Sequence, residues 1–291
     1  MQYVIYGANG WIGRSAVSVL LSVFEVPKSE ILLIGSVDSR ILIEGKFYRV
    51  FSQSSSLDKI RHGAIFFNSA FLRREKILEL GVKKYLSANN RISTFAENII
   101  MTKNLKSFIN ISSGAARYFD QDGIQPNFDH YGYLKNKWEK KFRLISNKFG
   151  SQIINCRVFS VTGKHINEYK NLAISTFIQQ AIRYNKIDVK SPGTLRTFID
   201  AEDLSSVLFN MCAKEINFSI DSGGELISLE KLARIIANQF SISTSEISYG
   251  HLAEPDYFGD FNQFNQIAGE LEVNYLKMEG QVRKTLEAFI T

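Results

Sequence analysis

The sequence is poor in the residues that define several protein classes. It has two cysteines, Cys156 and Cys212, which lie far apart among apolar neighbours and lack the spacing of metal ligands. This pattern excludes a disulfide framework and predicts reduced thiols in a cytoplasmic protein without a metal site. With only four prolines and 45% hydrophobic residues, the chain is not of low complexity, so we expect it to be globular.

Long hydrophobic runs are absent as well. The most apolar stretch, residues 16–24, is too short to span a bilayer, and a strand-like run begins at Gln2, which leaves no room for a signal peptide. We therefore expect a soluble protein without a membrane partner. The net charge is +6, but acidic residues are interleaved with the 35 Lys and Arg. This favours attraction of an anionic small molecule over a nucleic-acid partner.

Strand-like and helix-like segments alternate through the first half of the chain. Apolar runs predict strands at 2–6, 31–34, 48–51, 64–67, 107–111 and 153–159, and helical periodicity recurs at 11–24, 75–80, 95–105 and 134–149. The alternation predicts an α/β fold over residues 1–162: a Rossmann-type, doubly wound parallel sheet with helices on both faces. The weaker pattern of residues 163–291 predicts a smaller, irregular substrate lobe, some of whose segments return to the sheet.

A glycine-rich turn follows the first predicted strand and opens the first predicted helix. It reads Gly7-Ala8-Asn9-Gly10-Trp11-Ile12-Gly13, in the context that a dinucleotide fingerprint requires. The first glycine permits a tight turn, the second lets backbone N–H groups approach a pyrophosphate, and the third allows close packing of helix and strand. We expect the cofactor to contact Gly7, Asn9, Gly10, Trp11, Ile12, Gly13 and Arg14.

The choice of nicotinamide cofactor depends on the end of the second strand. An acidic side chain there bonds the ribose diol and excludes a 2′-phosphate. This chain has Ser36 and Arg40 in that region, with Arg14 just after the glycine turn, and these side chains suit the phosphate of NADP(H). Asp38 leaves NAD(H) open, so the sequence favours NADP(H) and keeps NAD(H) as the alternative.

Tyr131 and Lys135 lie four residues apart in a predicted helix and therefore share one face. Tyr133 and Lys137 have the same spacing, but they project toward the polar side of the helix, whereas the first pair flanks its apolar stripe. A tyrosine that donates a proton near neutral pH needs its phenolate stabilised, which a nearby ammonium provides. We predict Tyr131 as the general acid and Lys135 as its partner, which also holds the cofactor ribose.

A third catalytic group is expected where the strand at 107–111 ends. Ser112 and Ser113 follow this strand directly, at the edge where ligands of parallel sheets bind. Hydroxyl residues in such turns often serve only the turn itself. We prefer Ser113 to Ser112 as the hydroxyl that orients the substrate, and Ser112 remains the alternative.

Together these motifs give the chain a family resemblance. It resembles the extended short-chain dehydrogenases/reductases, of the NAD-dependent epimerase/dehydratase type that acts on nucleotide sugars. The glycine turn, the serine loop at 112–115 and the helix at 131–139, with its glutamate four residues after the lysine, are similar to that family's motifs. Segments 157–163, 196–204 and 218–223 are similar to three further motifs, in the family's order.

The resemblance implies roles for further residues. Arg196 would bind the diphosphate of a nucleotide-sugar substrate, for which the alternative is a surface ion pair with Asp200 or Glu202. Substrate contacts are also implied for Ser160, where the family often has asparagine, and for Asn171 and Leu172, which would open a helix beside the nucleotide. The loop beside the cofactor would be Asn68, Ser69 and Ala70. The resemblance also implies a homodimer and a role in polysaccharide biosynthesis.

The family's reactions can be compared with the residues present. Its 4,6-dehydratases carry a Thr-Asp-Glu loop where this chain has Gly114-Ala115-Ala116, which excludes dehydration. The short segment between Tyr118 and Tyr131 and the tip of the second strand favour a 4-ketoreductase of a nucleotide-linked 4-keto-6-deoxyhexose over an NAD-dependent 4-epimerase. A non-catalytic dinucleotide-binding protein would be expected to lose Tyr131 or Lys135, and both are present.

Overall fold

The computed structural model describes residues 1–121, 124, 129–167, 172–215 and 217–290. The chain divides into two compact units. The first consists of Met1–Val158 and Leu208–Ile220, and the second of Phe159–Val207 and Asp221–Thr291. The chain therefore leaves the first unit after residue 158 and returns to it for thirteen residues before its C-terminal part.

The described residues of the first unit form an eight-stranded sheet in the order β11-β7-β6-β5-β1-β2-β4-β3. The strands are β1 (Tyr3–Tyr6), β2 (Ile31–Gly35), β3 (Ser39–Ile43), β4 (Lys46–Ser52), β5 (Ile65–Asn68), β6 (Ser107–Ser113), β7 (Gln152–Val158) and β11 (Phe218–Asp221). Every neighbouring pair from β7 to β4 is parallel, whereas β3 runs antiparallel to β4. The predicted parallel sheet is confirmed.

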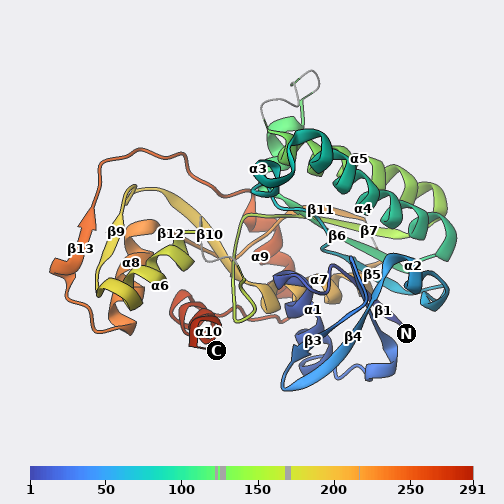
Figure 1. Ribbon diagram of the computed structural model, residues 1–291, viewed down its shortest axis with the longest axis horizontal. Helices are drawn as coiled ribbons and strands as arrows, with labels where there is room; N and C mark the ends of the chain where they lie inside the picture. Colours follow the sequence, from blue (N-terminus) through green and yellow to red (C-terminus); the bar gives the residue numbers. More distant parts are fainter. Residues whose placement is uncertain (122–123, 125–128, 168–171, 216, 291) are drawn as a thin grey trace. The chain divides into compact units, whose positions relative to one another are not determined.

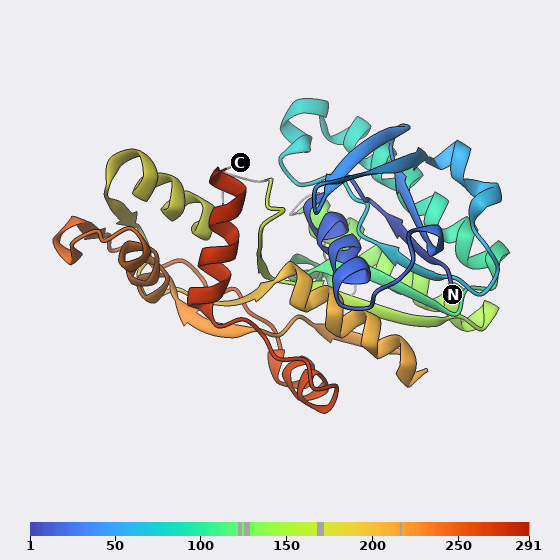
Figure 2. The same cartoon turned by 90° about the horizontal axis from the view of Figure 1, so that it is seen from below.

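Helices cover both faces of this sheet. α4 (Val82–Lys103) and α5 (His130–Phe149) lie on one face and α1 (Trp11–Ser22) on the other (Figure 1 and Figure 2). The remaining helical segments of this unit are α2 (Gln53–Ser56), α3 (Lys76–Leu80) and the 3-10 helices η1 (Lys28–Glu30), η2 (Leu57–Lys59), η3 (Gly114–Phe119) and η5 (Cys212–Lys214). Beneath α4 and α5 lies a core of buried residues that includes Tyr6, Phe66, Phe95, Phe108 and Phe142. The inner strands β1, β2 and β5 are mostly apolar because both of their faces are covered.

Two elements of the first unit differ from the sequence prediction. The strand β3, which the apolar pattern does not predict, pairs with β4 across a tight turn at Glu44 and Gly45, whose φ angles are 48° and 71°. α4 begins at Val82 rather than near residue 95. Its first half buries Asn89 and Ser93, so polar residues interrupt the apolar periodicity there.

The second unit contains two small sheets. β8 (Ser160–Thr162), β10 (Leu195–Asp200) and β12 (Glu225–Ser228) form one, and β9 (Ile187–Val189) and β13 (Ile247–Tyr249) form the other. Its helical segments are α6 (Ala173–Tyr184), α8 (Leu229–Gln239), η6 (Thr244–Glu246), α9 (Phe261–Glu270) and α10 (Met278–Ile290), while α7 (Ala201–Met211) leads back to the first unit. α8 packs against both α6 and α10. Within the described ranges, no helix is long and apolar enough to cross a membrane.

Candidate active site

The glycine-rich turn joins β1 to α1. Gly7 has a φ of +92°, and its N–H donates to the carbonyl of Ile34 on β2 at 2.9 Å. A Cβ on Gly13 would lie 2.3 Å from the Gly7 carbonyl oxygen, so only glycine lets α1 begin this close to the turn. Gly10 is exposed and caps α1 without a side-chain hydrogen bond. The positive end of α1 is therefore open to an anion.

Two buried donors beside the turn fit a bound dinucleotide. Nε1 of Trp11 and Nε of Arg14 are buried and have no hydrogen-bond partner among the described residues. Both belong to the first turn of α1, as does the partly buried Ile12. Buried donors normally pair with an acceptor, and phosphate oxygens are suitable ones. The side chain of Asn9 lies in the same turn, and its Nδ2 donates to the Ser39 hydroxyl at 3.4 Å.

The loop after β2 carries the residues expected to select the cofactor. All three of these are exposed: Ser36, Asp38 and Arg40. The Asp38 carboxylate accepts the Ser55 hydroxyl at 3.0 Å and the Ser52 N–H at 3.3 Å, and these bonds hold the pKa of Asp38 below its usual value. Arg40 lies on β3 directly opposite Arg49 on β4. The Arg49 guanidinium lies 4.5 Å from the centroid of the Phe51 ring.

The loop after β5 lies against the glycine turn. The N–H and the hydroxyl of Ser69 both donate to the Tyr6 carbonyl, at 2.9 Å and 3.0 Å. The backbone of Ala70 comes so close to Gly7 that a Cβ on that glycine would lie 2.6 Å from the Ala70 nitrogen. Asn68 is buried, and its Oδ1 has no hydrogen-bond partner in the described part of the chain. The glycine turn after β1 and the loop at residues 68–70 after β5 thus lie against each other at the carboxyl ends of these neighbouring strands.

Tyr131 lies in the first turn of α5. Its backbone N–H donates to the side chain of Asp129, which caps the helix, at 3.1 Å. The partly buried ring packs edge-on against Phe71, with 5.7 Å between ring centroids. Two cations face the ring: the Arg74 guanidinium lies 5.6 Å and the Lys135 Nζ 5.9 Å from its centroid.

The competing pair, Tyr133 and Lys137, lies on a different face of α5. Tyr133 packs edge-on against Phe119 with 5.8 Å between centroids, and Lys137 is exposed. Gly132, between the two tyrosines, lets α5 approach η3, because a Cβ there would lie 2.6 Å from the Ala115 carbonyl oxygen. Lys135 is buried and Lys137 exposed, as the helix faces inferred from the sequence require. Tyr133 differs from that inference, because it is partly buried and packs against the core beneath α4 and α5 rather than on a polar face.

Lys135 holds its ammonium against β6 and an aromatic ring. Its Nζ donates to the Ile111 carbonyl at 2.8 Å and lies 4.1 Å from the centroid of the Phe71 ring. Burial lowers the pKa of Lys135 to about 7, and the Glu139 carboxylate opposes this shift. The bond to Ile111 joins α5 to β6 two residues before Ser113. The tyrosine–lysine helix and the serine strand are therefore fixed to each other.

The two candidate serines have different partners. β6 extends through both of them, rather than ending at residue 111 as the sequence predicts. The Ser112 hydroxyl donates to the buried Glu139 carboxylate, whereas the Ser113 oxygen accepts the Ala115 N–H at 3.3 Å. Accepting a bond leaves the Ser113 hydroxyl proton able to donate to a substrate. This difference supports the preference for Ser113.

Arg196 lies on β10 in the second unit. Its Nη2 is 3.5 Å from the Glu254 carboxylate, and its Nε is buried without a hydrogen-bond partner among the described residues. The long distance and the partial exposure of Glu254 make this a weak pair. The guanidinium therefore keeps capacity for an anion such as a diphosphate.

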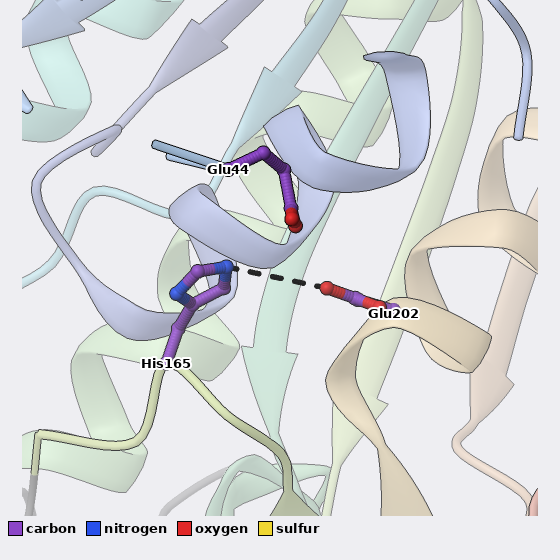
Figure 3. Close-up of side chains that lie close together, drawn as sticks. All are labelled: Glu44, His165 and Glu202. Carbon is purple, nitrogen blue, oxygen red and sulfur yellow. Dashed lines mark ion pairs between the residues drawn. The ribbon is translucent and has the colours of Figure 1, made fainter. Parts of the chain in front are cut away.

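The expected alternative for Arg196, an ion pair with Asp200 or Glu202, is wrong because other cations hold these carboxylates. The Nζ of Lys284 lies 2.7 Å from each of them. Glu202 also lies 3.2 Å from the Lys164 Nζ and 4.0 Å from His165, as Figure 3 shows for the histidine.

The other expected substrate residues of the second unit are less informative. Ser160 is partly buried on β8, opposite Phe198 of β10. Leu172 directly precedes α6, and its carbonyl accepts the Thr176 N–H at 2.9 Å. Asn171 lies outside the described residues.

Phe71 and Arg74, which surround Tyr131, are absent from the sequence-based site. Phe71 directly follows the loop at 68–70, and this position at a strand end is the one signal that could have indicated it. Arg74 carries no comparable signal, because only the fold brings it to α5. There it lies 2.6 Å from the capping Asp129.

The strand order, the glycine turn after β1 and the tyrosine–lysine helix define a Rossmann-type α/β protein. Solved structures with known activities share this fold. A UDP-N-acetylglucosamine 4-epimerase from Methanobrevibacter ruminantium, in complex with UDP-N-acetylmuramic acid, has a TM-score of 0.77 at 16% identity, over 99% of this chain and 98% of its own. A UDP-glucose 4-epimerase from Thermotoga maritima, with UDP-glucose, has a TM-score of 0.72 at 14% identity, over 100% and 99%.

A dTDP-glucose 4,6-dehydratase from Streptomyces venezuelae, with NAD bound, also has a TM-score of 0.72 at 14% identity, over 100% of this chain and 98% of its own. No protein-family model and no curated protein sequence matches the chain. At these identities the likeness shows a common fold over the full length. The chain thus has the fold of nucleotide-sugar epimerases and dehydratases.

Proposed function

We propose that the protein is an NAD(P)H-dependent oxidoreductase of nucleotide sugars, of the extended short-chain dehydrogenase/reductase type. One observation carries this proposal: buried Lys135 lies near the Tyr131 ring and donates to the Ile111 carbonyl, two residues before Ser113. We infer that Tyr131, Lys135 and Ser113 form one catalytic site at the end of β6, with a phenol, an ammonium and a hydroxyl. The specific reaction proposed is reduction of the 4-keto group of a nucleotide-linked 4-keto-6-deoxyhexose.

Each of the three residues has a role in this reaction. Tyr131 donates its phenolic proton to the ketone oxygen as that oxygen gains negative charge. The Lys135 ammonium stabilises the phenolate that remains. Ser113 donates its hydroxyl proton to the same ketone oxygen and orients it. NAD(P)H, when bound, supplies the hydride that reduces the carbonyl carbon.

The first unit is proposed to hold the dinucleotide. The close-packed turn at Gly7–Gly13, the uncapped start of α1 and the buried donors of Trp11 and Arg14 suit its phosphates. NADP(H) is the proposed preference, because Arg40 and Arg49 lie opposite each other and like charges in such positions repel. A 2′-phosphate would relieve this repulsion. Arg40→Ala should raise the Michaelis constant for NADPH several-fold and that for NADH little.

The second unit is proposed to bind the nucleotide sugar, with Arg196 on its diphosphate. Ser160, Asn171 and Leu172 are the further proposed contacts, and the active form is proposed to be a homodimer. Arg196→Ala should raise the Michaelis constant for the nucleotide sugar far more than that for NADPH, because a guanidinium pairs well with phosphate oxygens. An unchanged sugar affinity would mean that Arg196 serves only its pair with Glu254.

The reaction is tested with keto and hydroxy sugars in parallel. A reductase should consume NADPH stoichiometrically with a nucleotide-linked 4-keto-6-deoxyhexose and form a 4-hydroxy sugar. Absorbance at the nicotinamide band measures this directly. Absence of NADPH or NADH consumption with every nucleotide-linked keto sugar would contradict the proposal.

An NAD-dependent 4-epimerase is the second candidate, and the fold shared with two 4-epimerases favours it. An epimerase takes and returns the same hydride, so it would interconvert two 4-hydroxy sugars at constant nicotinamide absorbance. Chromatography of the sugar products detects this conversion. Cofactor released on denaturation gives a second measurement: tightly held NAD favours the epimerase, and no retained cofactor favours the reductase.

A further inference from the structure

A buried carboxylate lies one helical turn beyond the lysine of the candidate active site. Glu139 follows Lys135 by four residues on α5 and is only 7% exposed. Its carboxylate accepts the hydroxyl of Ser112 from β6. It also accepts Nε and Nη2 of Arg157 from β7, at 3.0 Å and 2.7 Å. Glu139 therefore joins α5 to two neighbouring strands of the sheet.

Arg157 extends this cluster to the end of η3. Its Nη1 and Nη2 donate to the Asp120 carboxylate at 2.7 Å and 2.6 Å, in a two-pronged pair. Asp120 also accepts the Asn136 amide at 2.9 Å. Asp120 thus accepts the guanidinium N–H groups that do not donate to Glu139. The cluster is thus fully bonded at its centre, where Glu139 is buried and Arg157 mostly buried, whereas Asp120 is half-exposed.

Among the described residues, the ammonium of Lys135 has few polar neighbours. One carbonyl, that of Ile111, and the ring of Phe71 receive it. The titratable groups of this region lie on several elements. Tyr131 and Glu139 lie on α5, and Arg74, Asp129 and Tyr85 of α4 lie near Tyr131. Arg157 of β7 pairs with Glu139 and also with Asp120. Glu139 lies one helical turn from Lys135 on the same face of α5, and the two side chains bond to adjacent residues of β6, Ser112 and Ile111. Its negative charge therefore favours the ammonium form of Lys135.

We propose that Glu139 is a positioning residue of the reaction, with two roles. Its charge favours the ammonium form of the buried Lys135, and its hydrogen bond holds Ser112, which leaves Ser113 as the hydroxyl that faces the substrate. The first role needs only the charge of Glu139, and the second needs only its hydrogen bond. The proposal rests on the proposed function for its catalytic meaning, whereas the charge on Lys135 can be measured without a substrate.

A purely structural role would give a different result. If Glu139 only fastens α5 to the strands, its replacement changes stability but leaves the protonation of Lys135 unchanged. If its charge acts on Lys135, removing that charge lowers the lysine's pKa, because burial then acts unopposed. Removing Ser112 breaks a neutral bond to the same carboxylate and should leave the lysine's pKa unchanged. Ser112→Ala is therefore the matched control.

The experiment is a titration of Lys135 by nuclear magnetic resonance in protein labelled with carbon-13 at the lysine Cε. The Lys135 signal is assigned by its loss in Lys135→Met. In Glu139→Gln the titration midpoint should fall by about one pH unit or more. In Ser112→Ala it should stay at the wild-type value, and Glu139→Asp, which keeps the charge, should restore most of the shift. Equal midpoints in folded wild-type protein and Glu139→Gln would overturn the proposal.

Loss of the carboxylate leaves Arg157 partly unpaired in a buried place, so Glu139→Gln can fail to fold. The double variant Glu139→Gln/Arg157→Gln removes both charges and avoids an unpaired ion. Its Lys135 midpoint should lie below the wild-type value but above that of Glu139→Gln, because loss of the more distant Arg157 cation acts in the opposite direction. A midpoint at or above the wild-type value in this variant would overturn the proposal.

Activity gives a second readout of the same proposal. With NADPH and the keto sugar, the alkaline limb of the pH profile of kcat/KM should move to lower pH in Glu139→Gln, in step with the Lys135 midpoint. A shifted midpoint in a protein that reduces no sugar would contradict the proposed function and leave the charge effect intact. If Glu139→Gln stays active with an unshifted Lys135 midpoint and an unshifted pH profile, the role of Glu139 would be contradicted and the proposed function would stand.

Discussion

Tyr131 is distinguished from Tyr133 by its surroundings. Phe71 packs against its ring, and the cations of Arg74 and Lys135 face it, whereas Tyr133 packs against Phe119. Tyr131→Phe should lower turnover by about 100-fold or more while cofactor affinity changes little, because only proton transfer is lost. Tyr133→Phe should be nearly silent. Steady-state kinetics measure the turnover of both variants, and equilibrium binding measures their affinity for NADPH. A larger loss of turnover in Tyr133→Phe than in Tyr131→Phe would mean that the proton donor lies on the other face of α5.

Lys135 also predicts a pH dependence of stability. Its pKa is about 7 in the folded protein and about 10.4 in an unfolded chain. Below pH 7 both states hold the proton, so the full cost of burying the ammonium is present. Between these two values the unfolded chain binds more protons, so stability rises with pH, by at most about 1.4 kcal/mol per unit. Above pH 10.4 the cost is gone.

Lys135→Met removes this dependence. The variant should be more stable than the wild type at pH 6.5, and its advantage should shrink steadily up to pH 9.5. Urea unfolding at a series of pH values measures the difference. Lys137→Met, at an exposed position two residues away on the same helix, is the control and should show a constant difference. A constant difference for Lys135→Met as well would contradict the lowered pKa.

At the residue scale, the sequence predicts what periodicity and spacing encode. The faces of Lys135 and Lys137 follow from helical geometry, and the glycine turn follows from its position between strand and helix. Periodicity cannot reveal the partners of a side chain across elements. Ser112 and Ser113 are adjacent and alike in sequence, and only the packing of Glu139 from another element separates them. The contact of Arg196 with Glu254 is equally non-local.

Among the elements, three parallel strands share a ladder of buried amides. Asn68 of β5, Asn110 of β6 and Asn155 of β7 occupy one register. The Asn68 amide donates to Asn110 at 3.0 Å, the Asn110 amide donates to Asn155 at 2.8 Å, and the Asn155 amide donates to the Glu139 carbonyl on α5 at 3.4 Å. The ladder therefore links the loop beside the glycine turn to the tyrosine–lysine helix.

Asn110→Leu tests this ladder. It removes the central amide and leaves the Asn68 donor and the Asn155 acceptor buried without their partner, at a cost of about 1–3 kcal/mol for each group. The unfolding free energy should fall accordingly, as measured by urea denaturation. The exposed Asn98 on α4 supplies the control, since Asn98→Ala should change stability little. A loss no larger than that of the control would mean that the ladder adds nothing to stability.

The elements themselves were predictable to the extent that burial follows a simple pattern. Inner strands such as β2 and β5 are largely apolar runs, because they are covered on both faces. The edge strand β3 escapes this rule, since Arg40 and Leu42 are exposed while Ile41 and Ile43 are buried. Its alternation is short and is joined to β4 by a two-residue turn. The first half of α4 escapes detection because it buries polar side chains.

Over the whole molecule, charge is distributed unevenly between the two units. Counted on the full sequence, the first unit has nearly twice as many Lys and Arg as Asp and Glu, whereas the second has more acidic than basic residues. The interleaving noted in the sequence conceals this difference, because the unit boundaries are not visible in it. A strongly basic unit attracts anions over a distance that salt limits to about 10 Å at 0.1 M.

This distribution predicts the salt dependence of cofactor binding. NADP(H) carries a 2′-phosphate that NAD(H) lacks, so its affinity should fall more steeply as sodium chloride rises from 20 to 500 mM, since screening acts on each charge. Titration calorimetry at several salt concentrations gives the two slopes. Arg40→Ala should bring the NADP(H) slope close to that of NAD(H). Lys148→Ala, at an exposed position near the C-terminal end of α5, is the control and should leave both slopes unchanged. Equal slopes for the two cofactors in wild-type protein would exclude a phosphate site at Arg40 and favour NAD(H).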